Sequence, residues 1–408
     1  MAGAKNEQPK KVLVTRKLLV YLDSSDYSVL SDPKRMSAEV ESVLARLEQF
    51  KKEGRVSFVY SGAAICEMAP QEATHATYAE DRANLLSKLC DRNALVSFDR
   101  LIAGEAAQVG ASEPLPFIPL SEDGDWFPEM KGLISPVDLV QVFRQKMTSL
   151  KAGLNRKQRR AAESSTFRRG SLRGSARDSL SDSKNQRGFD ELLAAYPMRP
   201  GAARILWNHV AGTATKKQAE DAFLESLRDP KWMMSWFHNH HDTLSPVVTW
   251  LRGPSVKAAG VVREAATKLR AIRKGGDSEE QARLIKEWRP ELIESVWSAI
   301  VERSAGSDQT PGIAAIEERS AGLNVMLNAY YTVFADAALT EREPKDSDFA
   351  DMMHAAYSPY VDIFRADRYM APHVQRIVTR YGTKVVSRLT ELPRSIETAL
   401  RSSSGISQ

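Results

Sequence analysis

Residues 18–25 have the sequence LLVYLDSS, a short apolar run that changes abruptly to one acid and two serines. Strand-forming side chains dominate the run, and the change at Asp23 marks the end of a buried strand. In SAEVESVLARLEQFKK, residues 37–52, apolar side chains recur at helical spacing. This stretch therefore predicts a strand that carries Asp23 at its carboxyl end, followed by a helix.

The same alternation continues through the first hundred residues. VSFVYS at 56–61 has the composition of a second strand, and a helix beginning near Gly62 would carry Glu67. DRANLLSKLCD at 81–91 is helical in pattern, and ALVSFD at 94–99 is another short apolar segment. Strands that alternate with helices predict a parallel α/β core.

The alternation returns near the end of the chain. DSDFADMMHAAYSPY at 346–360 has a helical pattern and opens with acids, whereas VDIFRAD at 361–367 is a strand pattern that ends in an acid. TKVVSRL at 383–389 is a further short strand candidate. Both ends of the chain are thus expected to contribute to one sheet.

The middle of the chain differs in character. Strand patterns largely disappear between residues 112 and 339, and long amphipathic stretches with tryptophans replace them. We therefore expect an α/β domain built from 1–111 and 340–408, interrupted by a large, mostly α-helical insertion at 112–339. Tryptophans at helical intervals are expected in its core.

Composition sets broad limits on function. A chain of 408 residues exceeds what one hydrophobic core usually organises, and the formal charge of +5 permits a polyanionic partner without establishing one. Cys66 and Cys90 are the only cysteines, which excludes a disulfide framework and a cysteine zinc site. With no apolar run long enough for a membrane span, we expect a cytoplasmic protein that does not associate with membranes.

Acidic residues occur at matching points of the two terminal segments. Asp23 and Asp367 end predicted strands, and Glu67 and Asp351 lie on neighbouring helices. In an open parallel sheet, ligands bind beyond the carboxyl ends of the strands, so these acids can converge. Converging carboxylates repel one another unless a cation lies between them, and oxygen ligands suit Mg²⁺ or Mn²⁺.

The order of these acids resembles that of a known family. YLDSSDYSVL at 21–30, ICEMAP at 65–70 and DFADMMHAAYSPYVDIFRADRYM at 348–370 resemble PIN-domain nucleases, particularly the larger PIN-like proteins of bacteria. The resemblance covers about 17–99 and 346–390. It implies a PIN-like parallel sheet flanked by helices and a metal-dependent endoribonuclease that uses Mg²⁺ or Mn²⁺, with RNA as substrate in preference to DNA. The catalytic and metal-binding acids that it implies are Asp23, Glu67, Asp351 and Asp367.

Several neighbours of these acids have supporting or alternative roles. Asp348, one helical turn before Asp351, is an alternative third ligand. Ala366 occupies a place where the family often has a small hydroxyl residue, which weakens the assignment of Asp367. Ser24 and Ser25 are expected to supply part of a polar shell around the ligands or the phosphate. Asp362 is expected to orient a neighbouring ligand, with a solvent-facing position at the start of its strand as the alternative. His354 either contacts the substrate phosphate or forms a structural hydrogen bond in the core.

A segment from 155 to 188 is rich in Arg, Lys, Ser and Gly and has little apolar content. It predicts a flexible basic loop whose cations bind a phosphate backbone through counterion release. The alternative is a solvated linker that does not bind nucleic acid. The cations of this predicted loop are Arg156, Lys157, Arg159, Arg160, Arg168, Arg169, Arg173 and Arg177.

Two other hypotheses compete with the nuclease hypothesis. In the first, the chain keeps the fold but binds nucleic acid without cleaving it. In the second, the helical insertion binds a protein partner, and the acids only stabilise the fold. Metal-dependent cleavage of nucleic acid and salt-sensitive binding to it distinguish the three hypotheses. The oligomeric state stays open at this level.

Overall fold

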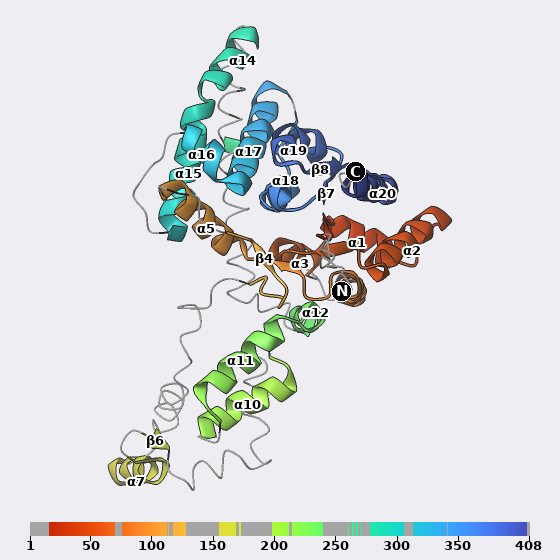
Figure 1. Cartoon of the computed structure of the whole chain (residues 1–408). Coiled ribbons are helices and arrows are strands. Elements are labelled where there is room, and N and C mark those ends of the chain that lie inside the picture. The colour runs from red at the N-terminus through yellow and green to blue at the C-terminus, as the bar shows by residue number, and fades with distance from the viewer. Residues whose placement is uncertain are drawn as a thin grey trace, which may run out of the picture.

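A computed structural model shows the arrangement of the chain (Figure 1). It describes residues 16–69, 76–111, 113, 117–127, 155–168, 171–172, 198–211, 214–239, 278–305, 313–340 and 342–405, and the single positions 260, 263, 264, 267 and 270. Among these residues, no helix combines the length and the apolar composition that crossing a membrane requires.

Four parallel strands form the central sheet, in the order β2-β1-β7-β8. They are β1 (Leu18–Tyr21), β2 (Val56–Val59), β7 (Ile363–Arg365) and β8 (Lys384–Val386). Val20 of β1 lies opposite Phe58 of β2 on one side and Ile363 of β7 on the other. The two ends of the sequence therefore meet in one sheet, and the predicted α/β fold with a parallel sheet flanked by helices is confirmed.

A short strand extends the sheet beyond β2. Tyr60, directly after β2, forms a parallel bridge with Ala94 of β3 (Ala94–Leu95). β3 in turn pairs antiparallel with β4 (Leu120–Ser121).

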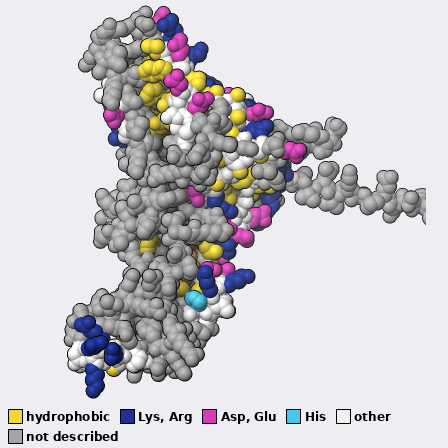
Figure 2. Space-filling view, turned by 90° about the vertical axis from the view of Figure 1, so that its left-hand side faces the viewer, with side chains coloured by type: hydrophobic (Ala, Val, Ile, Leu, Met, Phe, Trp, Pro, Cys, Tyr) yellow, Lys and Arg dark blue, Asp and Glu magenta, His cyan; other side chains and the backbone are white. Residues whose placement is uncertain are grey.

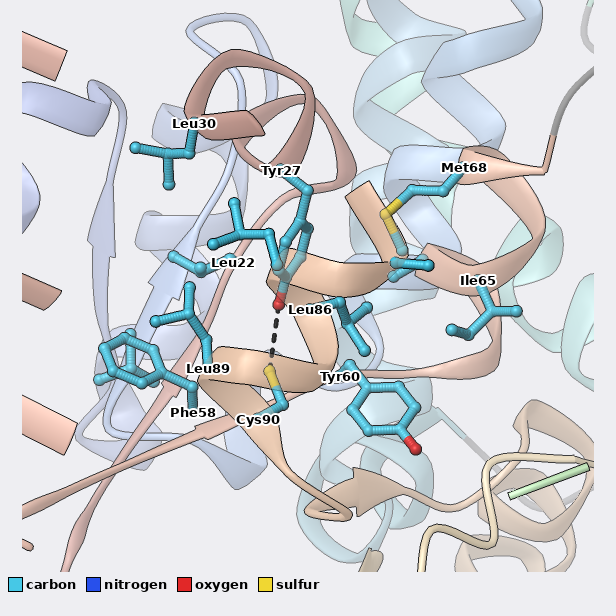
Figure 3. Close-up of a cluster of buried hydrophobic side chains, with 14 of the residues drawn as sticks. Leu22, Tyr27, Leu30, Phe58, Tyr60, Ile65, Met68, Leu86, Leu89 and Cys90 are labelled. Atoms are coloured by element: carbon cyan, nitrogen blue, oxygen red, sulfur yellow. Dashed lines mark hydrogen bonds between the residues drawn. The ribbon is translucent and has the colours of Figure 1, made fainter. Parts of the chain in front are cut away.

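Side chains alternate between the two faces of the sheet because successive strand residues point in opposite directions. Leu18 and Val20 belong to the hydrophobic cluster of the first face, and Tyr21 to that of the second. Figure 3 shows part of the first cluster, where the Tyr27 hydroxyl lies 3.2 Å from the buried thiol of Cys90. Helices of the first face are α1 (Ser24–Ser31), α2 (Ala38–Lys52), α4 (Ala76–Cys90), α12 (Pro230–Asn239) and α20 (Leu392–Gly405).

The second face is covered mainly by helices from the later part of the chain. They are α5 (Phe98–Gly110), α15 (Arg289–Ala305), α16 (Ile313–Arg319), α17 (Ala321–Leu339), α18 (Asp346–Ala355) and α19 (Met370–Val378). α3 (Gly62–Met68), whose Ile65 and Met68 are buried in the first cluster, contacts α1, α4 and α18. Short 3₁₀ helices follow at Ser358–Tyr360, Thr379–Tyr381 and Leu389–Glu391.

The described part of the middle region is mostly helical, as the sequence predicts. It also contains α10 (Pro200–Ala211), α11 (Lys216–Leu227) and α14 (Ser278–Glu287). Trp236 of α12 is buried in the same cluster as Phe58, and Leu323 of α17 in the same cluster as Phe364. Helices of this region therefore complete both faces of the sheet domain as well as interrupting its sequence.

The prediction of a flexible basic loop was wrong for residues 155–168. These residues form the helix α7 (Arg156–Thr166) and the strand β5 (Phe167–Arg168). β5 pairs with β6 (Ser171–Leu172). The helix has a capping box that the sequence reading overlooked. Asn155 Oδ1 accepts from the Gln158 amide at 2.9 Å, and Gln158 Oε1 accepts from the Asn155 amide at 2.9 Å. Three of the predicted cations lie outside the described residues: Arg169, Arg173 and Arg177.

A buried carboxylate attaches α17 to the N-terminal part of the chain. Glu105 of α5 is 1% exposed. Its Oε1 accepts from the Gly322 amide at 2.5 Å, and its Oε2 from the Leu323 amide at 2.7 Å. Tyr360 also donates to this carboxylate. Glu105 thus satisfies two donors that the first turn of a helix leaves without partners.

We predict that Glu105→Gln lowers the free energy of unfolding by about 1–3 kcal/mol, because one carboxylate oxygen is replaced and a buried amide is left without its acceptor. Urea denaturation monitored by circular dichroism measures the change. Glu41→Gln, at an exposed position of α2, is the matched control. Equal unfolding midpoints for the two variants would show that the contact at α17 contributes no stability.

Candidate active site

The sheet has a switch point between β1 and β7. The chain leaving β1 crosses to β2 on one side, whereas the chain leaving β7 crosses to β8 on the other. Ligands of open α/β sheets bind beyond the carboxyl ends of the strands at such a point. Asp23 lies two residues after the end of β1, and Asp367 two residues after the end of β7. The two predicted strand-end acids therefore flank the switch point.

Asp23 is held at the beginning of α1. It is the N-cap residue, and its carboxylate accepts from the Ser25 amide at 3.3 Å and from the Ser25 hydroxyl at 3.0 Å. Helix capping alone accounts for an Asp at this position. Its burial, at 8% exposed, and its acidic neighbours distinguish it from an ordinary surface cap.

Glu67 reaches the same region from α3. Its Oε2 accepts from the Ser24 hydroxyl at 2.5 Å and contacts His354 Nε2 at 3.0 Å. The Ser24 hydroxyl also lies 3.3 Å from Asp23 Oδ1. Ser24 therefore connects the first two predicted ligands, and His354 orients Glu67. Both residues thus contact predicted ligands directly.

Asp351 of α18 shares the electrostatic environment of the other acids. Burial raises its pKa, and the charges of Asp23, Asp367 and Glu67 raise it further, to about 8, against the opposing effect of His354. Neighbouring carboxylates that disfavour one another's ionisation are the arrangement that a cation relieves. All four predicted acids therefore act on one location.

His354 is 4% exposed and lies among these acids. Burial lowers its pKa, but Glu67, Asp23 and Asp351 raise it by more, so that the pKa is about 9. The imidazole is consequently protonated at neutral pH and contributes a positive charge beside Glu67. It partly balances the carboxylates.

Asp367 accepts a hydrogen bond from the Met370 amide at 2.6 Å, at the beginning of α19. A small cavity with a volume of about 10 Å³ opens beside these groups, enough for one water-sized sphere. Its lining includes Asp23, Asp351, His354 and Arg365. Asp23 from the N-terminal part of the chain and Asp351 and His354 from the C-terminal part thus border one cavity, whereas Glu67 and Asp367 do not belong to its lining.

In their present positions, no three His, Cys, Asp or Glu side chains of the described residues surround a point at which a metal ion would fit. Hydrogen bonds engage three of the carboxylates: Asp23 with Ser25, Glu67 with Ser24, and Asp367 with the amide of Met370. The residue types fit Mg²⁺ or Mn²⁺, because all four donors are hard oxygen ligands.

Asp348 is engaged elsewhere. Its carboxylate accepts from both terminal nitrogens of Arg342, at 2.9 and 2.8 Å, and from the Lys345 amide at 2.9 Å. The guanidinium carbon of Arg342 lies 3.5 Å from the ring centroid of Tyr369. This ion pair at the start of α18 favours Asp351 over Asp348 as the third ligand.

Asp362 lies away from the candidate site. It precedes β7, at the amino end of that strand, and binds the Leu19 amide at 2.7 Å and Arg16 at 3.1 Å. In a parallel sheet the amino ends lie opposite the edge that carries Asp23 and Asp367. The structure therefore gives Asp362 a role in joining β7 to β1, and not the supporting role at the site that the sequence reading assigned.

An ion pair that the sequence did not predict joins the end of β7 to α1. Arg365 Nη2 lies 3.0 Å from Asp26 Oδ1, and both side chains are buried. Arg365 also donates to the Val386 carbonyl at 3.2 Å, and Asp26 Oδ2 accepts from the Asp23 amide at 3.1 Å. Burial raises the pKa of Asp26 to about 7, although Arg365 opposes this change. The sequence contains one signal for the position of Asp26: it is an acid three residues after Asp23, the spacing of a capping box.

Comparisons of this chain with protein-family models, with curated proteins and with solved structures find no match. The geometry and chemistry of the site are therefore the basis for assigning a function.

Proposed function

We propose that this protein is a metal-dependent nuclease, an endoribonuclease that hydrolyses phosphodiester bonds at the carboxyl ends of β1 and β7. The observation that carries the proposal is the position of Asp23 and Asp367 on either side of the switch point, with Glu67 and Asp351 beside them. Acids from four separate elements at one location are more than helix capping requires.

The donor set defines the cofactor class. Four carboxylates suit Mg²⁺ or Mn²⁺. His354 is not one of these donors; it contacts Glu67. A bound ion of this kind supplies charge stabilisation and activates water for in-line displacement at phosphorus. Asp23, Glu67, Asp351 and Asp367 would hold it.

The protein's own groups provide orientation at this site. Ser24 connects Asp23 and Glu67, and the ion pair of Arg365 with Asp26 joins the end of β7 to the start of α1. Fixing two strand ends in this way would keep the carboxylates at a constant separation, which phosphoryl chemistry requires. The preference for RNA over DNA comes from the resemblance to PIN-domain nucleases.

We predict that the protein cleaves labelled single-stranded RNA in Mn²⁺ or Mg²⁺, and that Asp23→Asn and Asp367→Asn each lower kcat/KM at least about 100-fold. Changes to groups that only support a metal ligand already cost about 10- to 100-fold. Chelation of the ion should abolish cleavage in all samples.

Asp362→Asn is the matched control, since it makes the same change at the opposite end of β7. This variant should keep activity within a few-fold of the wild type once its folding has been verified. Equal cleavage by the wild type, Asp23→Asn and Asp367→Asn would exclude these carboxylates as the catalytic site.

A second candidate function, nucleic-acid binding without cleavage, is favoured by the exposed surface of α7. Arg156, Lys157, Arg159 and Arg160 are all exposed, and within the described structure Arg156, Lys157 and Arg160 form no ion pair. Figure 2 shows Lys and Arg side chains gathered at the lower end of the molecule, where α7 lies in Figure 1. Such a helix can neutralise phosphates whether or not the carboxylates catalyse hydrolysis.

We predict that changing these four residues to Gln weakens binding of single-stranded RNA and flattens its salt dependence. The slope of log K against log salt should fall by about 0.7 for each phosphate that is no longer neutralised, or about 2.8 for four. Fluorescence anisotropy in a chelator measures binding in the absence of cleavage.

The control variant removes the same charge from other exposed positions, and should keep the wild-type slope. A slope that falls equally in both variants would show a general effect of net charge and contradict a role for α7. The control positions are Lys52, Arg204, Lys216 and Lys217.

A further inference from the structure

A continuous series of hydrogen bonds extends from the interior of the protein to the candidate ligands. The Ser61 hydroxyl lies 2.7 Å from the Tyr21 hydroxyl, and the Tyr21 hydroxyl contacts His354 Nδ1. His354 Nε2 lies 3.0 Å from Glu67 Oε2, which also accepts from Ser24 at 2.5 Å. The series therefore connects β1 and α18 with α3 and the start of α1.

The contacts at Glu67 fix the orientation of its carboxylate. Two donors, one from His354 and one from Ser24, converge on the same oxygen, Oε2. A carboxylate held at one oxygen loses most of its freedom to rotate, and a fixed ligand binds a metal more tightly than a mobile one. The orientation of Glu67 thus depends on where His354 is held.

Tyr21 holds His354 from the opposite side of the imidazole. It is fully buried, and its ring stacks on that of Phe364, with ring centroids 5.3 Å apart. Because β1 and β7 pair in register at Tyr21 and Phe364, the tyrosine has little freedom to move. Its hydroxyl is a rigid partner for His354 Nδ1, although neither Tyr21 nor Ser61 lines the cavity.

We propose that Tyr21 and His354 are positioning residues that act through Glu67, so that removing the Tyr21 hydroxyl weakens divalent-ion binding at a site it does not touch. The inference rests on the proposed function, because it concerns the same metal ligands. It adds that Tyr21, a buried residue whose hydroxyl contacts that of Ser61, affects the site indirectly.

The test compares two substitutions that each remove one buried hydroxyl. Tyr21→Phe breaks the contact with His354, whereas Tyr357→Phe removes a hydroxyl that donates to the Val96 carbonyl at 2.9 Å and makes no contact with Glu67 or His354. The ring of Tyr357 packs at 6.5 Å from that of Tyr21, so both changes affect the same part of the core. Isothermal titration with Mn²⁺ alone measures the affinity, and thermal melting confirms that each variant is folded.

We expect Mn²⁺ to bind about 10-fold more weakly to Tyr21→Phe, a magnitude typical of groups that orient metal ligands. Tyr357→Phe should bind it as the wild type does. His354→Ala should show the larger loss, of about 10- to 100-fold, and His354→Gln should recover part of it, because its amide can donate to Glu67 in place of Nε2.

The outcomes separate this inference from the proposed function. Unchanged Mn²⁺ affinity in Tyr21→Phe and His354→Ala, with normal binding by the wild type, would overturn the positioning role and leave the metal site intact. Equal losses in Tyr21→Phe and Tyr357→Phe would show general damage to the core and would also overturn it. A folded wild-type chain that binds no Mn²⁺ would contradict the metal site itself, and the inference with it.

Discussion

Parallel pairing of β1 with β7 is the constraint on which the site depends. Val20 lies beside Ile363 and Tyr21 beside Phe364, which fixes the relative positions of two strands from opposite ends of the sequence. A shift of one residue would reverse which face of β7 enters which hydrophobic cluster, so burial on both faces stabilises this register. The same register sets the positions of Asp23 and Asp367. The stability of the sheet and the geometry of the candidate site therefore have a common origin.

The sequence predicted the parts of the fold that depend on local pattern. Each strand of the central sheet was predicted near its observed position, because buried parallel strands are short apolar runs with clear boundaries. Asp23 and Asp367 were expected together for the same reason, since both follow such runs. The predictions failed where tertiary contacts determine the role of a residue. Asp362, at the amino end of its strand, binds the Leu19 amide, and no local pattern indicates that partner.

Contacts between distant residues also explain what the sequence reading missed. Tyr21 and Arg365 have the appearance of ordinary strand residues, and only the folded arrangement brings them to His354 and Asp26. The basic segment differs for another reason: its low apolar content predicts no regular structure, whereas α7 begins with a capping box at Asn155. Helices of the middle region likewise pack on both faces of the sheet, which their sequence position does not indicate.

We propose a divalent-ion site at the carboxyl ends of β1 and β7. A crystal structure of the protein soaked in Mn²⁺ tests it most directly, through the anomalous difference density of the ion. We predict a peak bordered by carboxylate oxygens of Asp23, Glu67, Asp351 and Asp367. Mn²⁺ density at other positions, together with none at these strand ends, would show that these carboxylates do not form the ion site.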